Sequence, residues 1–390
     1  MTPLDAELSQ RLKAIRSEGL YRELRKINSP QGTHVVVDGK RLLNFSSNDY
    51  LGLANHPSLK SAVTEAVQKY GVGAGSARLI CGSLKVHHEL ERTLAEFKGT
   101  EAALTFSSGY ATAVGTICAL MEKEDVVIID RLVHACLVDG AKLSGAKLRV
   151  FAHNDVDELK DILEWAREKN ARRILIVTES VFSMDGDLAP LREIVELKER
   201  YGAWLMLDEA HATGLFGAKR RGLAEAFELA ERLDIQMGTL GKALGSAGGY
   251  ICGSRALIDY LINHARTFMF STAPVPPAAA AARAAIEMVR SPEGEALRTC
   301  LWARVDQVKN GLIGTPWKIP IVQSPIIPLM IGDEQRAMEA AAQLRTKGVL
   351  IPAVRYPTVA RGKARLRLTV SAAHTPEDMD EFLHASTRET

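Results

Sequence analysis

Lys242 is the residue of this chain whose surroundings point most directly to chemistry. It stands within the glycine-rich stretch Gly238–Gly245, behind the short run Leu233–Met237, and is the one charged residue between Asp234 and Arg255. We expect such a lysine to enter a cavity, where burial penalises the ammonium and makes the amine lose its proton more readily. A neutral amine can form a Schiff base with an aldehyde. The alternative is a glycine-rich loop with an incidental lysine.

A carboxylate upstream of Lys242 supports the first interpretation. The apolar residues Trp204–Leu207 are typical of a strand buried on both faces, and Asp208 follows at its C-terminal end. Open α/β sheets place their chemistry at that edge. A pyridoxal phosphate site needs a lysine for the Schiff base and an acid that keeps the pyridine nitrogen protonated. Asp208 and Lys242 fit these two roles, and His211 is placed to reach the ring hydroxyl.

A phosphate site is predicted near the start of a helix. Ser107–Tyr110 follow a predicted strand at 102–106 and open a helix. Free backbone N–H groups at a helix start bind phosphate well, and Gly109 lets the anion come close. Thr239 stands just before Lys242 in the chain, so its hydroxyl can serve the same phosphate. A plain strand-to-helix turn is the alternative.

Two further polar side chains follow predicted strands. His134 lies beyond the strand at 126–129, where its imidazole can stack on a pyridine ring. Ser180 follows the strand at 174–178, at the same edge of the sheet, where its hydroxyl can bind the cofactor. For His134 the alternative is a histidine that merely starts a helix.

The alternation of strands and helices from about residue 100 predicts a mainly parallel sheet covered on both faces. The predicted strands are 102–106, 126–129, 149–152, 174–178, 205–208, 235–237 and 249–253, and the helices between them include 155–169 and 190–200. Before them, the sequence predicts helical spacing over 4–26, a hairpin over 35–45 and a helix over 57–70.

The pattern changes after an alanine-rich helix at 277–290. Helices near 293–312 and 334–347 alternate with strands near 326–331 and 366–370, which predicts a smaller α+β unit. We therefore predict an α/β fold in three parts. These are an N-terminal helix and hairpin segment at 1–47, a large cofactor-binding domain at 48–285 and a small C-terminal domain at 286–390.

Composition excludes several classes of protein. The formal net charge is +2 and the pI is about 8.2, so neither nucleic acid nor a membrane surface is an expected partner. The five cysteines are scattered without a CxxC pair, which favours a reducing compartment over disulfides or a metal site. The apolar run Pro276–Ile286 is too short to span a bilayer, and the N-terminus shows no apolar signal segment. We expect a cytoplasmic protein without a metal.

Several motifs resemble the α-oxoamine synthases, a family of fold-type I pyridoxal phosphate enzymes. Three carry the family resemblance: Asn48–Gly52, Asp208–His211 and Thr239–Lys242. Three more look like the branch of that family in the biotin pathway: Phe151–Val156, Val181–Asp187 and Ala364–Thr369. The segment Gly75–Gly82 departs from this branch and is closer to the glycine-using branch.

The resemblance implies a role for each candidate residue. Toward the cofactor, these roles are a covalent bond from Lys242, ring contacts from Asp208, His211, His134 and Ser180, and phosphate contacts from Gly109, Tyr110 and Thr239. Toward the substrates, Arg367 and Asn48 are expected to bind the amino-acid carboxylate, because a guanidinium offers it a two-pronged match. His134 is expected to face the substrate as well, and Arg22 and Thr358 to contact the acyl group.

The activity implied by the resemblance is a decarboxylative condensation of L-alanine with a pimeloyl thioester, in a homodimer whose site lies between the subunits. The alternatives are the same chemistry on glycine with an acetyl donor, a non-catalytic partner subunit that keeps only the fold, and a transaminase. The sequence leaves open whether an acyl carrier protein or coenzyme A carries the acyl group, and which residues a second subunit contributes.

Overall fold

A seven-stranded sheet is the largest feature of the computed structural model, which describes residues 1–387. Its strand order is β3-β9-β8-β7-β6-β4-β5. β9 runs antiparallel to both of its neighbours, and the other strands run parallel to one another, so the prediction of a mainly parallel seven-stranded sheet is confirmed. The strands are β3 Ala102–Phe106, β4 Val126–Asp130, β5 Lys147–Phe151, β6 Ile174–Glu179, β7 Trp204–Asp208, β8 Ile235–Thr239 and β9 Gly249–Gly253.

Helices cover this sheet on both faces. Every residue of β4 and of β6 is therefore buried. Those between its strands are α4 Gly109–Leu120, α5 Ala135–Leu143, α6 Val156–Glu168, α7 Leu191–Tyr201 and the short α8 Leu223–Ala226. The remaining helices are α1 Pro3–Ser17, α2 Pro57–Tyr70, α3 Lys85–Lys98, α9 Arg255–His264, α10 Arg266–Met269, α11 Pro276–Arg290, α12 Pro292–Gly311, α13 Glu334–Thr346 and α14 Pro376–Thr387.

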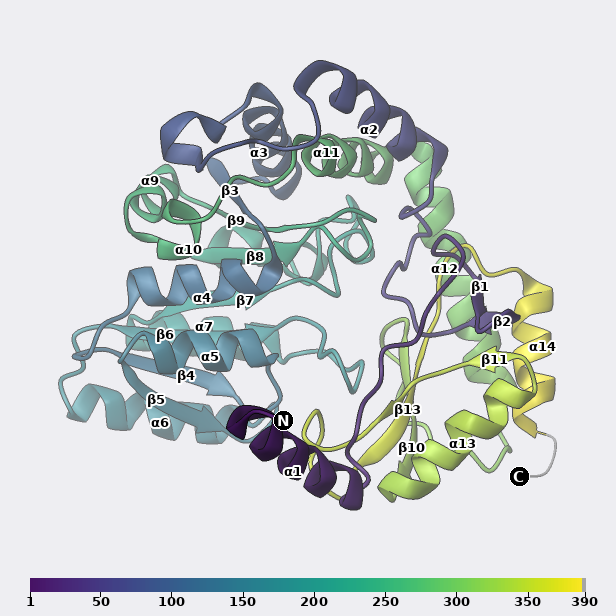
Figure 1. Ribbon diagram of the computed structural model, residues 1–390. Helices are drawn as coiled ribbons and strands as arrows, with labels where there is room; N and C mark the ends of the chain where they lie inside the picture. Colours follow the sequence, from purple (N-terminus) through teal and green to yellow (C-terminus); the bar gives the residue numbers. More distant parts are fainter. Residues whose placement is uncertain (388–390) are drawn as a thin grey trace.

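Two small sheets lie across the molecule from the large one (Figure 1). One contains the predicted hairpin, β1 His34–Val37 and β2 Lys40–Asn44, with β11 Val349–Leu350 parallel to β2. The other has the order β10-β13-β12, with β10 Ile326–Gly332, β13 Ala364–Thr369 and β12 Ala353–Val354. The N-terminal hairpin therefore joins the C-terminal part of the chain, and the segment after β2 crosses back toward the large sheet.

The predicted N-terminal helix is wrong in its length. α1 ends at Ser17 rather than near residue 26, and Gly19 follows with a φ of +68°, which glycine adopts without strain and which ends the helix. The apolar side of α1 is not buried: Leu4, Leu8, Leu12 and Ile15 are 40–64% exposed. The capping box between Thr2 and Asp5 fixes the first turn instead.

None of the helices within residues 1–387 combines the length and the hydropathy that crossing a bilayer requires.

A buried ion pair ties α3 to the strand that carries Asp208. The Lys98 ammonium donates to the Glu209 carboxylate and to the backbone carbonyl of Arg221, and both charged side chains are at most 1% exposed. Burial alone lowers the pKa of Lys98, but the charge and hydrogen bond of Glu209 outweigh it and raise the pKa above its ordinary value. The lysine therefore stays charged.

Replacing Lys98 by methionine is expected to lower the free energy of unfolding by about 3–5 kcal/mol, because Glu209 is left as an unpaired buried charge. The measurement is urea unfolding followed by circular dichroism. The matched control is Lys85→Met at the other end of α3, where the side chain is 73% exposed and pairs with Glu89 at 3.6 Å. We expect that control to change the free energy by less than about 0.5 kcal/mol, and equal effects at the two positions would contradict the assignment.

Candidate active site

The carboxyl ends of β6 and β7 bring three polar residues together. Glu179 and Asp208 are register partners on these neighbouring strands. Ser180 is fully buried, and both its backbone N–H and its hydroxyl donate to the Asp208 carbonyl, at 2.9 and 3.1 Å. The Ser180 side chain is thus held beside Asp208 at the predicted edge of the sheet.

Two buried carboxylates share this edge. Asp208 is 6% exposed and accepts a hydrogen bond from the backbone of Ala210 at 2.9 Å. Burial raises the pKa of Asp208, while the charge of Lys242 acts in the opposite direction. Burial and the nearby charge of Asp208 raise the pKa of Glu179 to about 8. A negative charge on one of these carboxylates therefore opposes ionisation of the other. The positive charge of Lys242 favours the ionised form of both.

Lys242 belongs to a hydrogen-bonded series of side chains that begins at Tyr50 and passes through His211. The lysine Nζ lies 2.8 Å from Nε2 of His211, and Nδ1 of the same ring lies 2.6 Å from the Tyr50 hydroxyl. Burial lowers the pKa of Lys242, opposed by the charges of Asp208 and Glu179, and burial lowers the pKa of His211 well below its usual range. Burial raises the pKa of Tyr50 to about 12, so its hydroxyl keeps its proton. The sequence prediction of a partly desolvated lysine beside Asp208 and His211 agrees with this arrangement.

His134 stands at the start of α5, directly after β4. Its Nδ1 accepts a hydrogen bond from the backbone of Cys136 at 3.3 Å, and its own backbone N–H donates to the Glu179 carboxylate. Partial burial and the charge of Lys242 lower the pKa of His134, which favours the neutral ring. His134 as a whole residue is nevertheless exposed.

Residues predicted to bind the phosphate also lie close together. Ser108 caps α4, with its side chain accepting from the backbone of Ala111 at 3.0 Å, so the N–H groups at the start of the helix point outward. The Thr239 hydroxyl lies 3.8 Å from the point that a Cβ on Gly109 would occupy. The side chain of Tyr110 turns elsewhere and donates to Asp139 at 2.6 Å, so Tyr110 offers its backbone N–H there. A helix N-terminus with an adjacent hydroxyl suits a phosphate.

Arg367 supplies the clearest sign of an absent anion. The side chain is 5% exposed on β13, and its Nη2 atom is buried without any hydrogen-bond partner. Its other nitrogens bind uncharged groups: Nε donates to the Ser183 carbonyl at 2.6 Å, and Nη1 donates to Asn48 Oδ1 at 3.1 Å and Thr369 Oγ1 at 2.9 Å. Its charge is felt at Tyr50 and Lys242, so the open nitrogen belongs to the same site. A carboxylate is the matching ligand.

Arg22 contacts the turn that contains Thr358. Both are exposed. Arg22 donates to the carbonyl of Tyr356 at 3.4 Å, and the backbone of Thr358 donates to the Arg355 carbonyl at 3.0 Å. Among residues 1–387, no hydrogen bond or ion pair joins either one to Lys242 or Arg367. Their role toward an acyl substrate stays a prediction.

Sequence reasoning missed three residues that the site depends on. Glu179 carries the same signal as Asp208, since it follows an apolar strand, yet only its neighbour Ser180 was considered. Tyr50 lies inside the motif Asn48–Gly52, but its partner His211 is 161 positions away. Ser183, whose carbonyl binds Arg367, lies inside the motif Val181–Asp187, but the motif does not single it out, because a backbone acceptor can belong to any residue.

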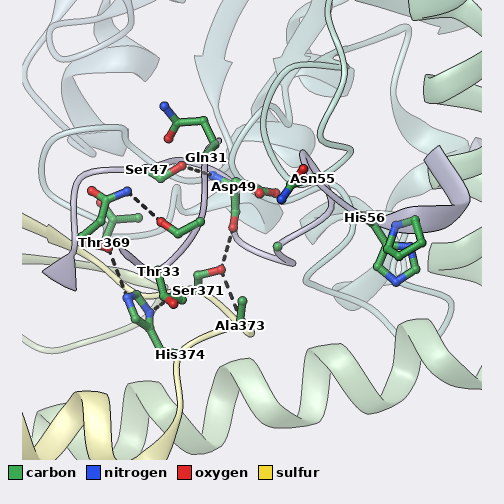
Figure 2. Close-up of a pocket in the computed structure, with 14 residues that line it drawn as sticks. Gln31, Thr33, Ser47, Asp49, Asn55, His56, Thr369, Ser371, Ala373 and His374 are labelled. Carbon is green, nitrogen blue, oxygen red and sulfur yellow. Dashed lines mark hydrogen bonds between the residues drawn. The ribbon is translucent and has the colours of Figure 1, made fainter. Parts of the chain in front are cut away.

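A cavity of about 310 Å³ is lined in part by Ser47 and Asp49, from the segment after β2, and by Thr369 and Ser371, at and just after the end of β13 (Figure 2). Its polar groups largely satisfy one another: the Ser371 hydroxyl donates to the Asp49 carbonyl at 2.7 Å, and His374 Nε2 lies 3.1 Å from the Asn44 carbonyl. These bonds hold β2 and the segment after it against the residues that follow β13. We assign the cavity a supporting role rather than a catalytic one.

Comparison with known proteins gives a consistent result. Residues 40–385 match the family model described as aminotransferase class I and II. The 8-amino-7-oxononanoate synthase of Geobacter sulfurreducens is 47% identical over 377 residues, which cover 97% of this chain and 96% of that protein.

Two solved structures are also similar. A lysine-to-alanine variant of serine palmitoyltransferase from S. paucimobilis, solved with a bound PLP–myriocin aldimine, has a TM-score of 0.93 at 28% identity and covers 99% of this chain and 98% of its own. The 8-amino-7-oxononanoate synthase of Francisella tularensis has a TM-score of 0.76 at 26% identity and covers 89% and 97%.

The ring of His211 is expected to stay neutral in the cofactor-free protein when the pH is lowered from about 8 to about 6. Burial depresses the pKa of the folded state below the ordinary value of about 6.5, so protonation requires a lower pH than in the unfolded chain. Nitrogen-15 NMR of the histidine rings measures this directly. The same ring in urea-unfolded protein serves as the control and should gain its proton within that window. A His211 ring that is fully protonated near pH 6 in the folded protein would contradict the burial argument.

Proposed function

The chain belongs to the aminotransferase class I and II family, and from this membership we propose that it condenses L-alanine with a pimeloyl thioester. The products are 8-amino-7-oxononanoate, carbon dioxide and the free thiol. Similarity to 8-amino-7-oxononanoate synthases over nearly the whole chain supports this proposal. The observation that carries it is the unpaired, buried Nη2 of Arg367, whose charge acts on the Lys242 amine.

Pyridoxal phosphate is the cofactor, and the donors and acceptors at the sheet edge fit it. When bound, it supplies an aldehyde for the substrate amino group and a ring that takes up the electrons released at Cα. Asp208 would hold the ring nitrogen as an ion pair, His211 would hold the ring oxygen, Ser180 would support the cofactor and His134 would stack on the ring. The start of α4 and Thr239 would hold the phosphate.

Lys242 is the residue that moves protons. Its amine, which burial makes easier to deprotonate, removes the proton from Cα of alanine and later returns one. His211 lies 2.8 Å from this amine and keeps it oriented, and the Tyr50 hydroxyl holds the other side of the imidazole at 2.6 Å. Because burial keeps the His211 ring neutral, it adds no second positive charge beside the amine.

Arg367 and Asn48 orient the amino acid. The guanidinium is fixed through Nε and Nη1, so Nη2 is left to bind the substrate carboxylate. Holding the carboxylate fixes which bond at Cα faces Lys242, and positioning of this kind is a large part of catalysis. Loss of the carboxylate as carbon dioxide then leaves Arg367 without its partner, which favours product release.

Arg22 and Thr358 are proposed to meet the distal end of the acyl chain. The segment after α1 and the loop at 355–358 touch, since Arg355 also donates to the Tyr21 carbonyl at 2.9 Å. An arginine there can bind a terminal carboxylate through a charge-assisted hydrogen bond. This pairing distinguishes a pimeloyl group, which ends in a carboxylate, from an acetyl group, which does not.

We also propose a cytoplasmic homodimer in which a second subunit completes the site. Large apolar side chains that a monomer leaves in water support the dimer: Ile80 is 79% exposed, Phe270 is 69% exposed and Leu79 is 49% exposed. Burying such groups against a partner is favourable.

Replacing Lys242 by alanine is expected to slow exchange of the alanine Cα proton with solvent deuterium by about a hundredfold or more, because a positioned general base contributes about that much. The measurement is proton NMR of L-alanine in deuterated buffer with the holoenzyme. The control is Lys219→Ala in the exposed loop after the site, which should exchange at the normal rate. Normal exchange in the Lys242→Ala variant would assign the base to another group.

An assay of L-alanine and glycine against pimeloyl-CoA, pimeloyl acyl carrier protein and acetyl-CoA tests the function itself. Four additional methylenes stabilise a bound pimeloyl group by roughly 3 kcal/mol if they are buried, so we expect a preference of about a hundredfold or more in kcat/KM. Alanine with a pimeloyl thioester should be the fastest pair. If glycine with acetyl-CoA is faster, the segment Gly75–Gly82 indicates the true substrate and the proposal is wrong.

A further inference from the structure

His153 lies outside the residues assigned above and bridges two carboxylates. It follows β5, and its Nδ1 lies 3.0 Å from Asp130 Oδ1 while its Nε2 lies 2.7 Å from Asp187 Oδ2. Only a doubly protonated ring can donate at both nitrogens. Partial burial by itself lowers the pKa of His153, but the hydrogen bonds and charges of Asp130 and Asp187 outweigh it and raise the pKa to about 10. The ring is therefore a permanent cation at neutral pH.

Asp187 belongs to a closed loop, residues 181–188, which we name the Ser183 loop. Its ends pair through a bridge between Val181 and Leu188, and the backbone of Phe182 donates to the Asp187 carbonyl at 3.0 Å. The His153 ring packs edge-on against Phe182 with the ring centroids 4.4 Å apart. His153 thus contacts the loop both through an ion pair and through an aromatic contact.

The imidazole is the principal partner of the Asp187 carboxylate. The other oxygen, Oδ1, is buried without a partner, and the only additional contact to Oδ2 among the described residues is from Asn154 at 3.3 Å. Removing the cation would leave a half-buried carboxylate that is poorly paired, which is unfavourable. Among the contacts that hold the loop, the ion pair with His153 is the one that holds Asp187.

The Ser183 loop in turn positions the side chain of Arg367. The Ser183 carbonyl accepts the Nε donor of Arg367 at 2.6 Å, and the Ser183 N–H binds the buried Glu179 carboxylate. With Nε fixed there, the guanidinium plane is fixed, and so is the direction of the unpaired Nη2. A displacement of the loop would turn this nitrogen away from a bound carboxylate.

We infer that His153 is a positioning residue for Arg367, and that by binding Asp130 and Asp187 at once it fixes the Ser183 loop in the place where Arg367 meets the amino-acid carboxylate. This inference rests on the proposed function, because the carboxylate is that of the amino-acid substrate. His153 does not touch the reacting atoms. Its effect reaches them through Asp187, Ser183 and Arg367.

The test is equilibrium binding of two ligands to the holoenzyme, followed by its absorbance. L-alanine has the carboxylate that Arg367 binds, and L-alaninamide lacks it. We expect His153→Gln to weaken L-alanine binding by about tenfold or more, since a small misplacement of a binding group has effects of this size, while L-alaninamide binding stays within about twofold. The matched control is His264→Gln, an exposed histidine on α9, which should change neither.

Equal weakening of both ligands would indicate general structural damage and would overturn the inference, as would unchanged L-alanine binding in a folded variant. If His153→Gln fails to fold, Asp187→Asn removes the same ion pair with little change in shape and should produce the same selective loss.

Nitrogen-15 NMR of the wild-type protein gives a second readout, and a neutral His153 ring near pH 8 would contradict the bridge. Failure of the proposed function has a different signature, because wild-type protein would then bind neither ligand.

Discussion

The site depends on the removal of its charged groups from water. Lys242, Asp208 and Glu179 meet where parallel strands end, and burial is the largest influence on the pKa of each. Burial lowers the pKa of the amine and raises those of the carboxylates, so the groups move toward the range in which protons transfer readily near neutral pH. The same burial would be too costly for isolated charges. Each group therefore faces an opposite charge or a backbone N–H.

The topology explains how distant residues share this environment. The sheet supplies Glu179, Asp208 and Lys242 from its carboxyl edge, while Arg367 comes from β13 of a small sheet. Tyr50 comes from the segment that crosses between them after β2. This segment is fixed where it begins, because Phe45 bonds to Leu350 and Thr369 through backbone hydrogen bonds of 2.9 and 3.0 Å. The site thus needs both the large sheet and the small ones.

The sequence was informative where a signal is local. Apolar runs predicted all seven strands of the large sheet. Lys242 and Asp208 were indicated as site residues by their positions after such runs. The sequence was uninformative where the role of a residue depends on a partner far away in the chain. Tyr50 has its role through the hydrogen bond to His211, and His153 through the ion pair with Asp187. The end of α1 was missed because helical spacing continues past Gly19, whose positive φ stops the helix. Whether the chain divides at 47/48 and 285/286 stays a prediction.

Two arginines on the same face of β13 differ in how their positive charges are compensated. Arg365 and Arg367 are each 5% exposed, and both bind the Ser183 loop. Arg365 forms an ion pair with Asp185, so its charge is compensated within the chain. Arg367 donates instead to uncharged acceptors of Ser183, Asn48 and Thr369. A buried cation without a counter-ion is unfavourable, and an incoming carboxylate relieves this cost. The positive charge of Arg367 is therefore left without a counter-ion among the described residues, which is consistent with the proposed binding of an amino-acid carboxylate there.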